Sequence, residues 1–204
     1  ATLEPLQVIE TKEVQNMDGE TVSSRLCSVN DVSPTKVGPY FVMALKEAGQ
    51  VWRINYEEDG FPVEKVTDVG EILHDGFLSH DNEIFFIASQ NSNHLAAIDV
   101  ESMEIVAKLE TGTKPHPGPG AVWQAGGKEY AATPHIGDNK NVIWDRENFE
   151  IVGEVPSSAP GLFVRANEKM EYVWFDSVFE PKPEEITVHE KSPPFDVVKR
   201  INHG

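Results

Sequence analysis

The stretch EIFFIASQNSNHLAAIDVESMEIV (residues 83–106) is matched without a gap, 46 residues later, by EYAATPHIGDNKNVIWDRENFEIV (residues 129–152). Glu83 falls on Glu129, and Asp99 falls on Asp145. Adding 46 once more aligns residues 150–152 with residues 196–198. A looser copy of the same repeat lies upstream of the first segment. The chain is therefore built from an internal repeat.

Each repeat unit reads as four short strands. In the clearest unit we expect them at residues 120–124, 128–133, 140–145 and 149–155. A period of about 40–50 residues with four strands is typical of β-propeller blades. The sequence therefore predicts an all-β chain of four-stranded blades. A meander or sandwich whose hairpins resemble one another by chance is the alternative.

The expected blades form a single domain over residues 1–204. They are assigned to 21–70, 74–112 and 117–204, with an insertion near 178–185, and residues 1–13 are assigned to the outer strand of a preceding blade. A closed propeller needs at least about four blades. We therefore expect this chain to be part of a larger propeller. A four-bladed ring that is closed by the N-terminal strand is the alternative.

The composition excludes several classes of protein. A net charge of -17 argues against nucleic acid and anionic membrane as partners, because both attract a basic surface. No apolar run approaches the roughly 18 residues of a membrane helix. The single cysteine, Cys27, excludes internal disulfides and cysteine-cluster metal sites, and no Cys-x-x-Cys-His motif for covalent haem is present.

Two histidines lie in loops that are stiffened by proline and glycine, at KPHPGPG (residues 114–120) and PHIGD (residues 134–138). In a propeller blade, the loop before the first strand and the loop after the second strand lie on the same side, near the central channel. His116 precedes the first strand of its blade, and His135 ends the second strand. We expect them to converge, joined by His74 from the equivalent loop of the preceding blade.

Such a cluster, together with Arg25 and Lys46, predicts a cationic pocket that binds a small anion. Imidazole also donates protons near neutral pH, so a catalytic role for His116 and His135 is expected. A zinc or copper site is the alternative, with His74 or Asp138 as the third ligand. The other histidines are expected on the solvated surface: His80, His94, His189 and His203.

The motifs also carry a family resemblance. In chain order they are EPL (4–6), LKEAGQ (45–50), LHDG (73–76), ASQNSN (88–93), KPHPGPGA (114–121) and ATPHIGD (132–138). Together they resemble the d1-haem domain of the cytochrome cd1 nitrite reductases and their relatives in d1-haem maturation. The resemblance implies an eight-bladed propeller that binds d1 haem non-covalently in its central channel. This chain would be about half of that propeller, and the other half would be its partner.

The resemblance also implies roles for individual residues. His116 and His135 match the distal histidines that bind and protonate nitrite as it is reduced to nitric oxide. Arg25, Lys46 and His74 are then expected near the cofactor, whereas the proximal iron ligand lies upstream of this part of the family sequence. A periplasmic location and a cytochrome or cupredoxin as electron donor are further implications.

One position departs from the reductase pattern. The reductases typically have arginine where this chain has Pro119. The form with proline is closer to the maturation branch, which handles d1 haem or its precursor without necessarily turning over nitrite. The alternatives to a nitrite reductase are therefore a d1-haem maturation or carrier protein and, from another class, an interaction propeller without a cofactor.

Overall fold

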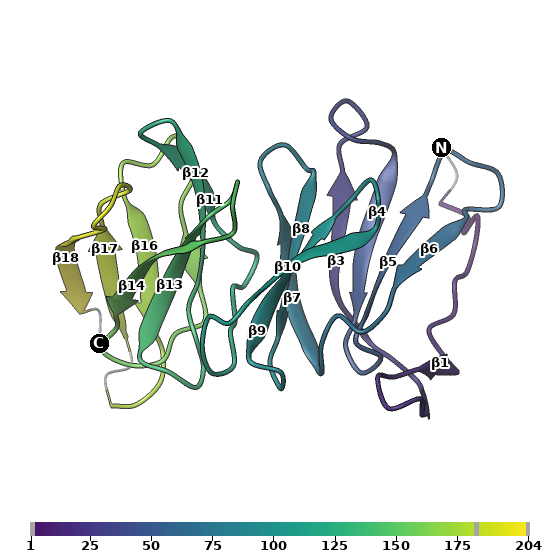
Figure 1. Ribbon diagram of the computed structural model, residues 1–204, viewed down its shortest axis with the longest axis horizontal. Coiled ribbons are helices and arrows are strands. Elements are labelled where there is room, and N and C mark those ends of the chain that lie inside the picture. The colour runs from purple at the N-terminus through teal and green to yellow at the C-terminus, as the bar shows by residue number, and fades with distance from the viewer. Residues whose placement is uncertain (1–2, 182–183, 203–204) are drawn as a thin grey trace.

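The chain folds into four consecutive antiparallel sheets of four strands each, as a computed structural model shows for residues 3–181 and 184–202 (Figure 1). No helix occurs in these described ranges. The four sheets follow one another along the long axis in chain order, from purple to yellow. Their strands are β3 (Leu26–Val32), β4 (Tyr40–Leu45), β5 (Gln50–Asn55), β6 (Val63–Val66); β7 (Leu73–Leu78), β8 (Ile84–Ser89), β9 (His94–Asp99), β10 (Glu104–Leu109); β11 (Val122–Ala125), β12 (Lys128–Thr133), β13 (Lys140–Asp145), β14 (Ile151–Pro156); and β15 (Val164–Arg165), β16 (Val173–Ser177), β17 (Glu185–His189), β18 (Val197–Asn202).

This arrangement confirms the four-stranded blades but corrects their number. Three blades were expected, whereas the structure has four, because the range 117–204 contains two complete sheets. The last sheet was not separated from the third because the expected insertion lies inside it, between the end of β16 and the start of β17. The expected strands of the clearest unit agree with β11 to β14 within two residues.

Hydrophobic packing between neighbouring blades holds the sheets together. All six residues of β8 are buried, because a middle strand of an inner blade is covered on both faces. Between the second and third blades, the rings of Phe86 and Trp144 meet edge to face with centroids 5.3 Å apart. Such contacts add about 0.5–1.5 kcal/mol to the burial of the rings. Each blade is therefore positioned by its neighbours.

The N-terminal segment differs from the expectation. Residues 3–10 form no strand, because this segment has no ladder partner in the described chain. The first strands are instead the short pair β1 (Val14–Gln15) and β2 (Thr21–Val22), which form a separate two-stranded sheet. Val14 packs on the face of the first blade, against a cluster that includes Trp52.

The order of strands in each sheet decides where a site can form. The first strand of each blade, β3, β7, β11 or β15, is an edge strand with one hydrogen-bonded neighbour. β3 contacts β7 across the boundary between the first two blades. First strands therefore bring side chains from different blades together. The described part of the chain contains no helix with the length and apolar character needed to cross a bilayer.

Candidate functional site

A β-bulge in β7 prepares one half of the site. His74 pairs with Ala88 and Gly76 pairs with Ile87, so Asp75 is an extra residue without a partner on β8. Asp75 has a left-handed backbone with φ 54°, which is rare for a residue other than glycine. Neighbouring residues of a regular strand point to opposite faces. The bulge removes that constraint, and Asp75 turns back toward the ring of His74.

The loop before β11 supplies the other half. The backbone N–H of His116 donates to the carbonyl of Pro134 (2.9 Å), which fixes the residue against the loop that follows β12. The Nδ1 atom of its ring lies 3.0 Å from the carbonyl oxygen of Leu162, and Nδ1–H is therefore the donor. The Nε2 atom is left to face Asp75, 3.3 Å from its Oδ2 atom.

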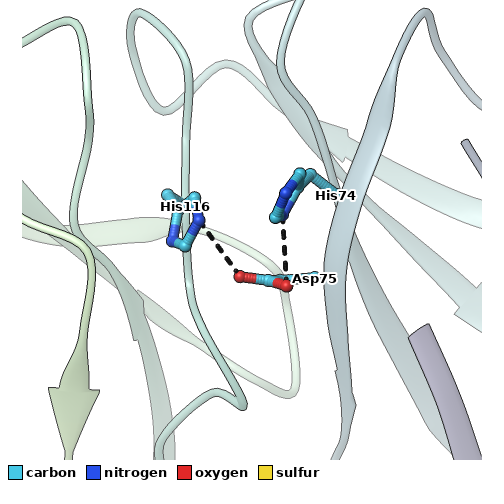
Figure 2. A group of neighbouring side chains, drawn as sticks. All are labelled: His74, Asp75 and His116. Carbon is cyan, nitrogen blue, oxygen red and sulfur yellow. Dashed lines mark ion pairs between the residues drawn. The ribbon is translucent and has the colours of Figure 1, made fainter. Parts of the chain in front are cut away.

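The Asp75 carboxylate contacts both histidine rings, one with each oxygen (Figure 2). Its Oδ1 atom is 3.1 Å from Nδ1 of His74, and the two ring centroids are 4.9 Å apart. Burial alone would raise the pKa of Asp75, but the hydrogen-bonding contact with His74 and the electrostatic influence of His116, His74 and Lys46 outweigh it and lower this pKa. The carboxylate therefore stays ionised and holds both rings in place.

Asp75 lines a cavity of about 340 Å³ on the side of the first strands. The wall combines apolar side chains with small residues and a few polar groups, from the first strands of two blades and from the loops before β11 and β15. It is lined by Cys27, Ser28, Val29, Asn30, Asp75, Gly76, Gly118, Pro119 and Phe163. This volume lies at the lower end of the range for small-molecule pockets. Asp75 is the one carboxylate among the described lining residues, and none of them is lysine or arginine.

The expected convergence of His116 and His135 is wrong at the level of side chains. The residue opposite His135 is Pro115, in an isolated antiparallel bridge. Directly opposed residues share a face, and the next residue points to the other face. His116 therefore turns away from His135. The prediction that His74 joins His116 is confirmed by their ring contact.

His135 is instead a buried structural residue. It has no exposed surface, and its Nδ1 atom donates to the carbonyl of Lys140 (3.1 Å) while Nε2 accepts from the hydroxyl of Thr111 (3.1 Å). Burial is the main reason that the pKa of His135 falls to about 4. The ring is therefore neutral near pH 7, with both nitrogens occupied, and it is poorly suited to donate a proton.

The expected cationic residues, Arg25 and Lys46, are not among the residues that line the cavity. Arg25 is largely exposed and pairs with Glu47 at 2.5 Å. Lys46 acts on the site through its charge, since it contributes to the lowered pKa of Asp75. Asp138, the other candidate metal ligand, accepts from the backbone N–H of Thr113. In the described chain, the group of side chains that can hold a metal is His74, Asp75 and His116.

Two histidines that were expected on the surface are buried. His94 and His189 each bond a backbone carbonyl, of Val69 (2.8 Å) and Phe195 (2.9 Å) respectively. His80 is exposed as expected and lies 3.2 Å from Glu168. His203 lies outside the described residues.

Asp75 was missed as a site residue. Its signal in the sequence is Gly76, which follows it in the LHDG motif. A Cβ atom at Gly76 would lie 2.4 Å from the ring of Phe85, so only glycine permits the close approach beside the bulge. A carboxylate between histidine and such a glycine could have been recognised as a bulged residue.

The glycine-rich loop that carries His116 leads to a prediction on stability. Gly120 has φ +76°, and a Cβ atom there would lie 2.0 Å from the ring of Phe77. We expect Gly120→Ala to lower the free energy of unfolding by about 3 kcal/mol, through overpacking and backbone strain together. Urea denaturation measures this loss.

A matched control separates the two causes. Gly126 has a similar φ of +60° but nothing within 4 Å of an added Cβ atom. Gly126→Ala should therefore show only the cost of the left-handed backbone, about 1 kcal/mol. Equal losses in the two variants would show that the contact with Phe77 does not constrain the loop.

Comparison of the sequence with known proteins identifies the family to which the chain belongs. Residues 1–203 match the family model described as cytochrome D1 heme domain. A nitrite reductase of Stutzerimonas stutzeri is 27% identical over 205 residues, which covers 90% of this chain and 35% of that protein. A dihydro-heme d1 dehydrogenase of Pseudomonas aeruginosa (strain PAO1) is 29% identical over 175 residues, covering 85% of this chain and 35% of that protein. The chain thus spans about a third of the length of these relatives.

Solved structures confirm the fold. The dihydro-heme d1 dehydrogenase NirN, in complex with DHE, superposes with a TM-score of 0.80 at 24% identity, over 98% of this chain and 41% of that one. The hydrazine synthase of Kuenenia stuttgartiensis gives a TM-score of 0.65 at 13% identity, over 98% of this chain and 52% of that one. The chain is therefore a propeller in fold, and its four blades correspond to about half of a larger propeller.

Proposed function

Because this chain belongs to the cytochrome d1 haem domain family, with residues 1–203 matching its model, we propose that it binds a d1-type haem against the first strands of its blades and acts in the maturation of that haem. The substrate class is dihydro-haem d1, and the reaction is its oxidation to haem d1. The observation that carries the proposal is the group His74, Asp75 and His116, whose carboxylate lines the cavity.

The residues present fit one side of such a macrocycle. Val29, Pro119 and Phe163 offer apolar surface to a flat ring system, and Gly118 leaves space beside it. A Cβ atom at Gly118 would lie 2.7 Å from Phe163, so a larger side chain would disturb this wall. The buried Nδ1 atom of His74 faces Asp75 at 3.1 Å, so the carboxylate that lines the cavity also orients this ring.

The reaction needs a group that accepts protons. Oxidation of a dihydro-porphyrin removes two electrons and two protons, and the bound haem supplies the redox chemistry. His116 can take up a proton at Nε2 because its Nδ1–H is already committed to Leu162. Asp75 stabilises the resulting imidazolium, as a carboxylate does in other histidine–carboxylate pairs. The electrons pass to an acceptor of the cytochrome or cupredoxin class, in the periplasm.

The charge of the cavity favours this reaction over the reduction of nitrite. The ionised Asp75 lies beside both histidines, and no described lysine or arginine side chain lines the cavity. Pro119 occupies the lining position at which the resemblance expects arginine in the reductases. The cavity therefore attracts a small anion less strongly than the cavity of a reductase with arginine at this position.

Nitrite reduction is the second candidate. It is favoured by two adjacent imidazoles, which can present N–H groups to an anion above the haem, and by the 27% identity with a nitrite reductase. In that case His74 and His116 act as proton donors, in the roles that the sequence assigned to His116 and His135.

Reconstitution of the full-length protein separates these functions. We expect dihydro-haem d1 to bind with a shift of its visible bands, and to be oxidised to haem d1 when an electron acceptor is added. Nitric oxide formation from nitrite should be slow by comparison. Rapid nitric oxide formation without oxidation of dihydro-haem d1 would favour the second candidate, and an unchanged spectrum would leave a propeller without a cofactor.

A further inference from the structure

We propose that His74, Asp75 and His116 also form a binding site for a divalent transition-metal ion of the zinc class. One ligand atom from each residue lies within 4.8 Å of the others. The three side chains approach from β7 and from the loop before β11, and their polar atoms meet at one place (Figure 2). Two imidazoles and one carboxylate are a ligand set that binds Zn²⁺ with an open position for a fourth ligand.

The ring of His116 is oriented as a metal ligand would be. Metal-binding histidines usually donate their other ring N–H to a carbonyl or a carboxylate, which fixes the tautomer. Here Nδ1–H of His116 donates to the carbonyl of Leu162 at 3.0 Å. The lone pair of Nε2 then points to Asp75, 3.3 Å away, and this contact is unfavourable unless a proton or a cation lies between the two atoms.

His74 provides an independent indication. Its Nδ1 atom is buried and lies 3.1 Å from Oδ1 of Asp75, yet it makes no well-aligned hydrogen bond in the described chain. A ring nitrogen that faces a carboxylate oxygen at this distance needs a proton or a cation between the two atoms. A cation bound between His74, Asp75 and His116 would satisfy both rings and the carboxylate at once.

The surrounding charges permit a cation. The groups that act on Asp75 are the two histidines and Lys46, whose contribution is the smallest of these. Cys27 also lines the cavity, but burial raises the pKa of its thiol to about 12, so it is no thiolate ligand at neutral pH. The site therefore offers nitrogen and oxygen ligands, which suit Zn²⁺ or Co²⁺.

Metal binding and proton transfer exclude each other at this site. A metal needs the bare lone pair of each ring, whereas a proton acceptor must keep it free. Zn²⁺ should therefore inhibit the reaction on haem; this consequence, unlike the metal site itself, rests on the proposed function.

Calorimetric titration of the haem-free chain with ZnCl₂ at pH 7.5 tests the site. We expect one ion to bind per chain, and Asp75→Asn and His74→Ala each to weaken binding at least tenfold. Asp75→Asn keeps the size of the side chain. His80→Ala is the matched control, because His80 lies beside a carboxylate on the exposed surface and its loss should leave the binding unchanged.

A second measurement does not depend on the variants. Co²⁺ added to the wild-type chain should give the visible absorption of a tetrahedral site with nitrogen and oxygen ligands, and Zn²⁺ should displace it. Absence of both the heat of Zn²⁺ binding and the Co²⁺ bands would overturn the proposal, as would equal binding by wild type and Asp75→Asn. Haem binding is measured separately, so a chain that binds Zn²⁺ but not haem refutes the proposed function alone.

Discussion

His116→Ala in the full-length protein should slow the oxidation of dihydro-haem d1 by about 10²–10⁴-fold, which is the usual contribution of a positioned proton-transfer group. The variant removes the ring nitrogen that faces Asp75 at 3.3 Å. The loop that carries residue 116 stays in place, because the backbone N–H of this residue donates to the carbonyl of Pro134. The bound substrate should therefore keep its shifted visible bands while turnover falls.

The rate is measured in single turnover with an artificial electron acceptor. His80→Ala serves as the control, because His80 is exposed and lies outside the cavity. Circular dichroism at pH 7 checks that each variant is folded. A variant His116→Ala that binds the substrate and oxidises it at the wild-type rate would exclude His116 from proton transfer.

His135→Gln should make the chain more resistant to acid. The folded protein protonates His135 only near pH 4, whereas the unfolded chain does so near 6.5. Between these values the unfolded state binds the proton and the folded state does not, so stability falls as the pH falls. The difference corresponds to about 3 kcal/mol between pH 7.5 and pH 4. Glutamine keeps a polar side chain in place of the ring and lacks this titration.

Urea denaturation at both pH values measures the effect as a difference between proteins. The wild type should lose about 3 kcal/mol more than His135→Gln on going to pH 4, whatever the carboxylates contribute to both. His80→Gln should behave as the wild type, since this exposed ring is in contact with solvent in both states. If wild type and His135→Gln lose the same stability, His135 is not held neutral in the folded chain.

The repeat made most of the fold predictable. A four-stranded unit leaves a pattern in the sequence because every blade buries the same strand faces against its neighbours. Where the pattern was interrupted, at residues 178–184, the last blade was not separated from the third. The prediction of an N-terminal strand was wrong for a different reason. Apolar residues alone do not provide a neighbouring strand to pair with.

The site was predictable only to the level of loops. Propeller geometry correctly predicted that His74 and His116 lie on the same side of the sheets, close to each other. Which way a side chain points depends on register, and a shift of one residue reverses it. Pro115 opposite His135 decides that register, and the sequence contains no signal for it. The bulge at Asp75, by contrast, had a signal in the sequence, the glycine that follows it.

The central claim is that the working group is His74, Asp75 and His116, and that His135 supports the fold. It is tested most directly by comparing the rates of dihydro-haem d1 oxidation of His116→Ala and His135→Gln at pH 7, with both proteins loaded with substrate. We predict a loss of at least about 100-fold for His116→Ala and a rate close to wild type for His135→Gln. Equal losses in the two variants would contradict the account, because they would require the two histidines to act together.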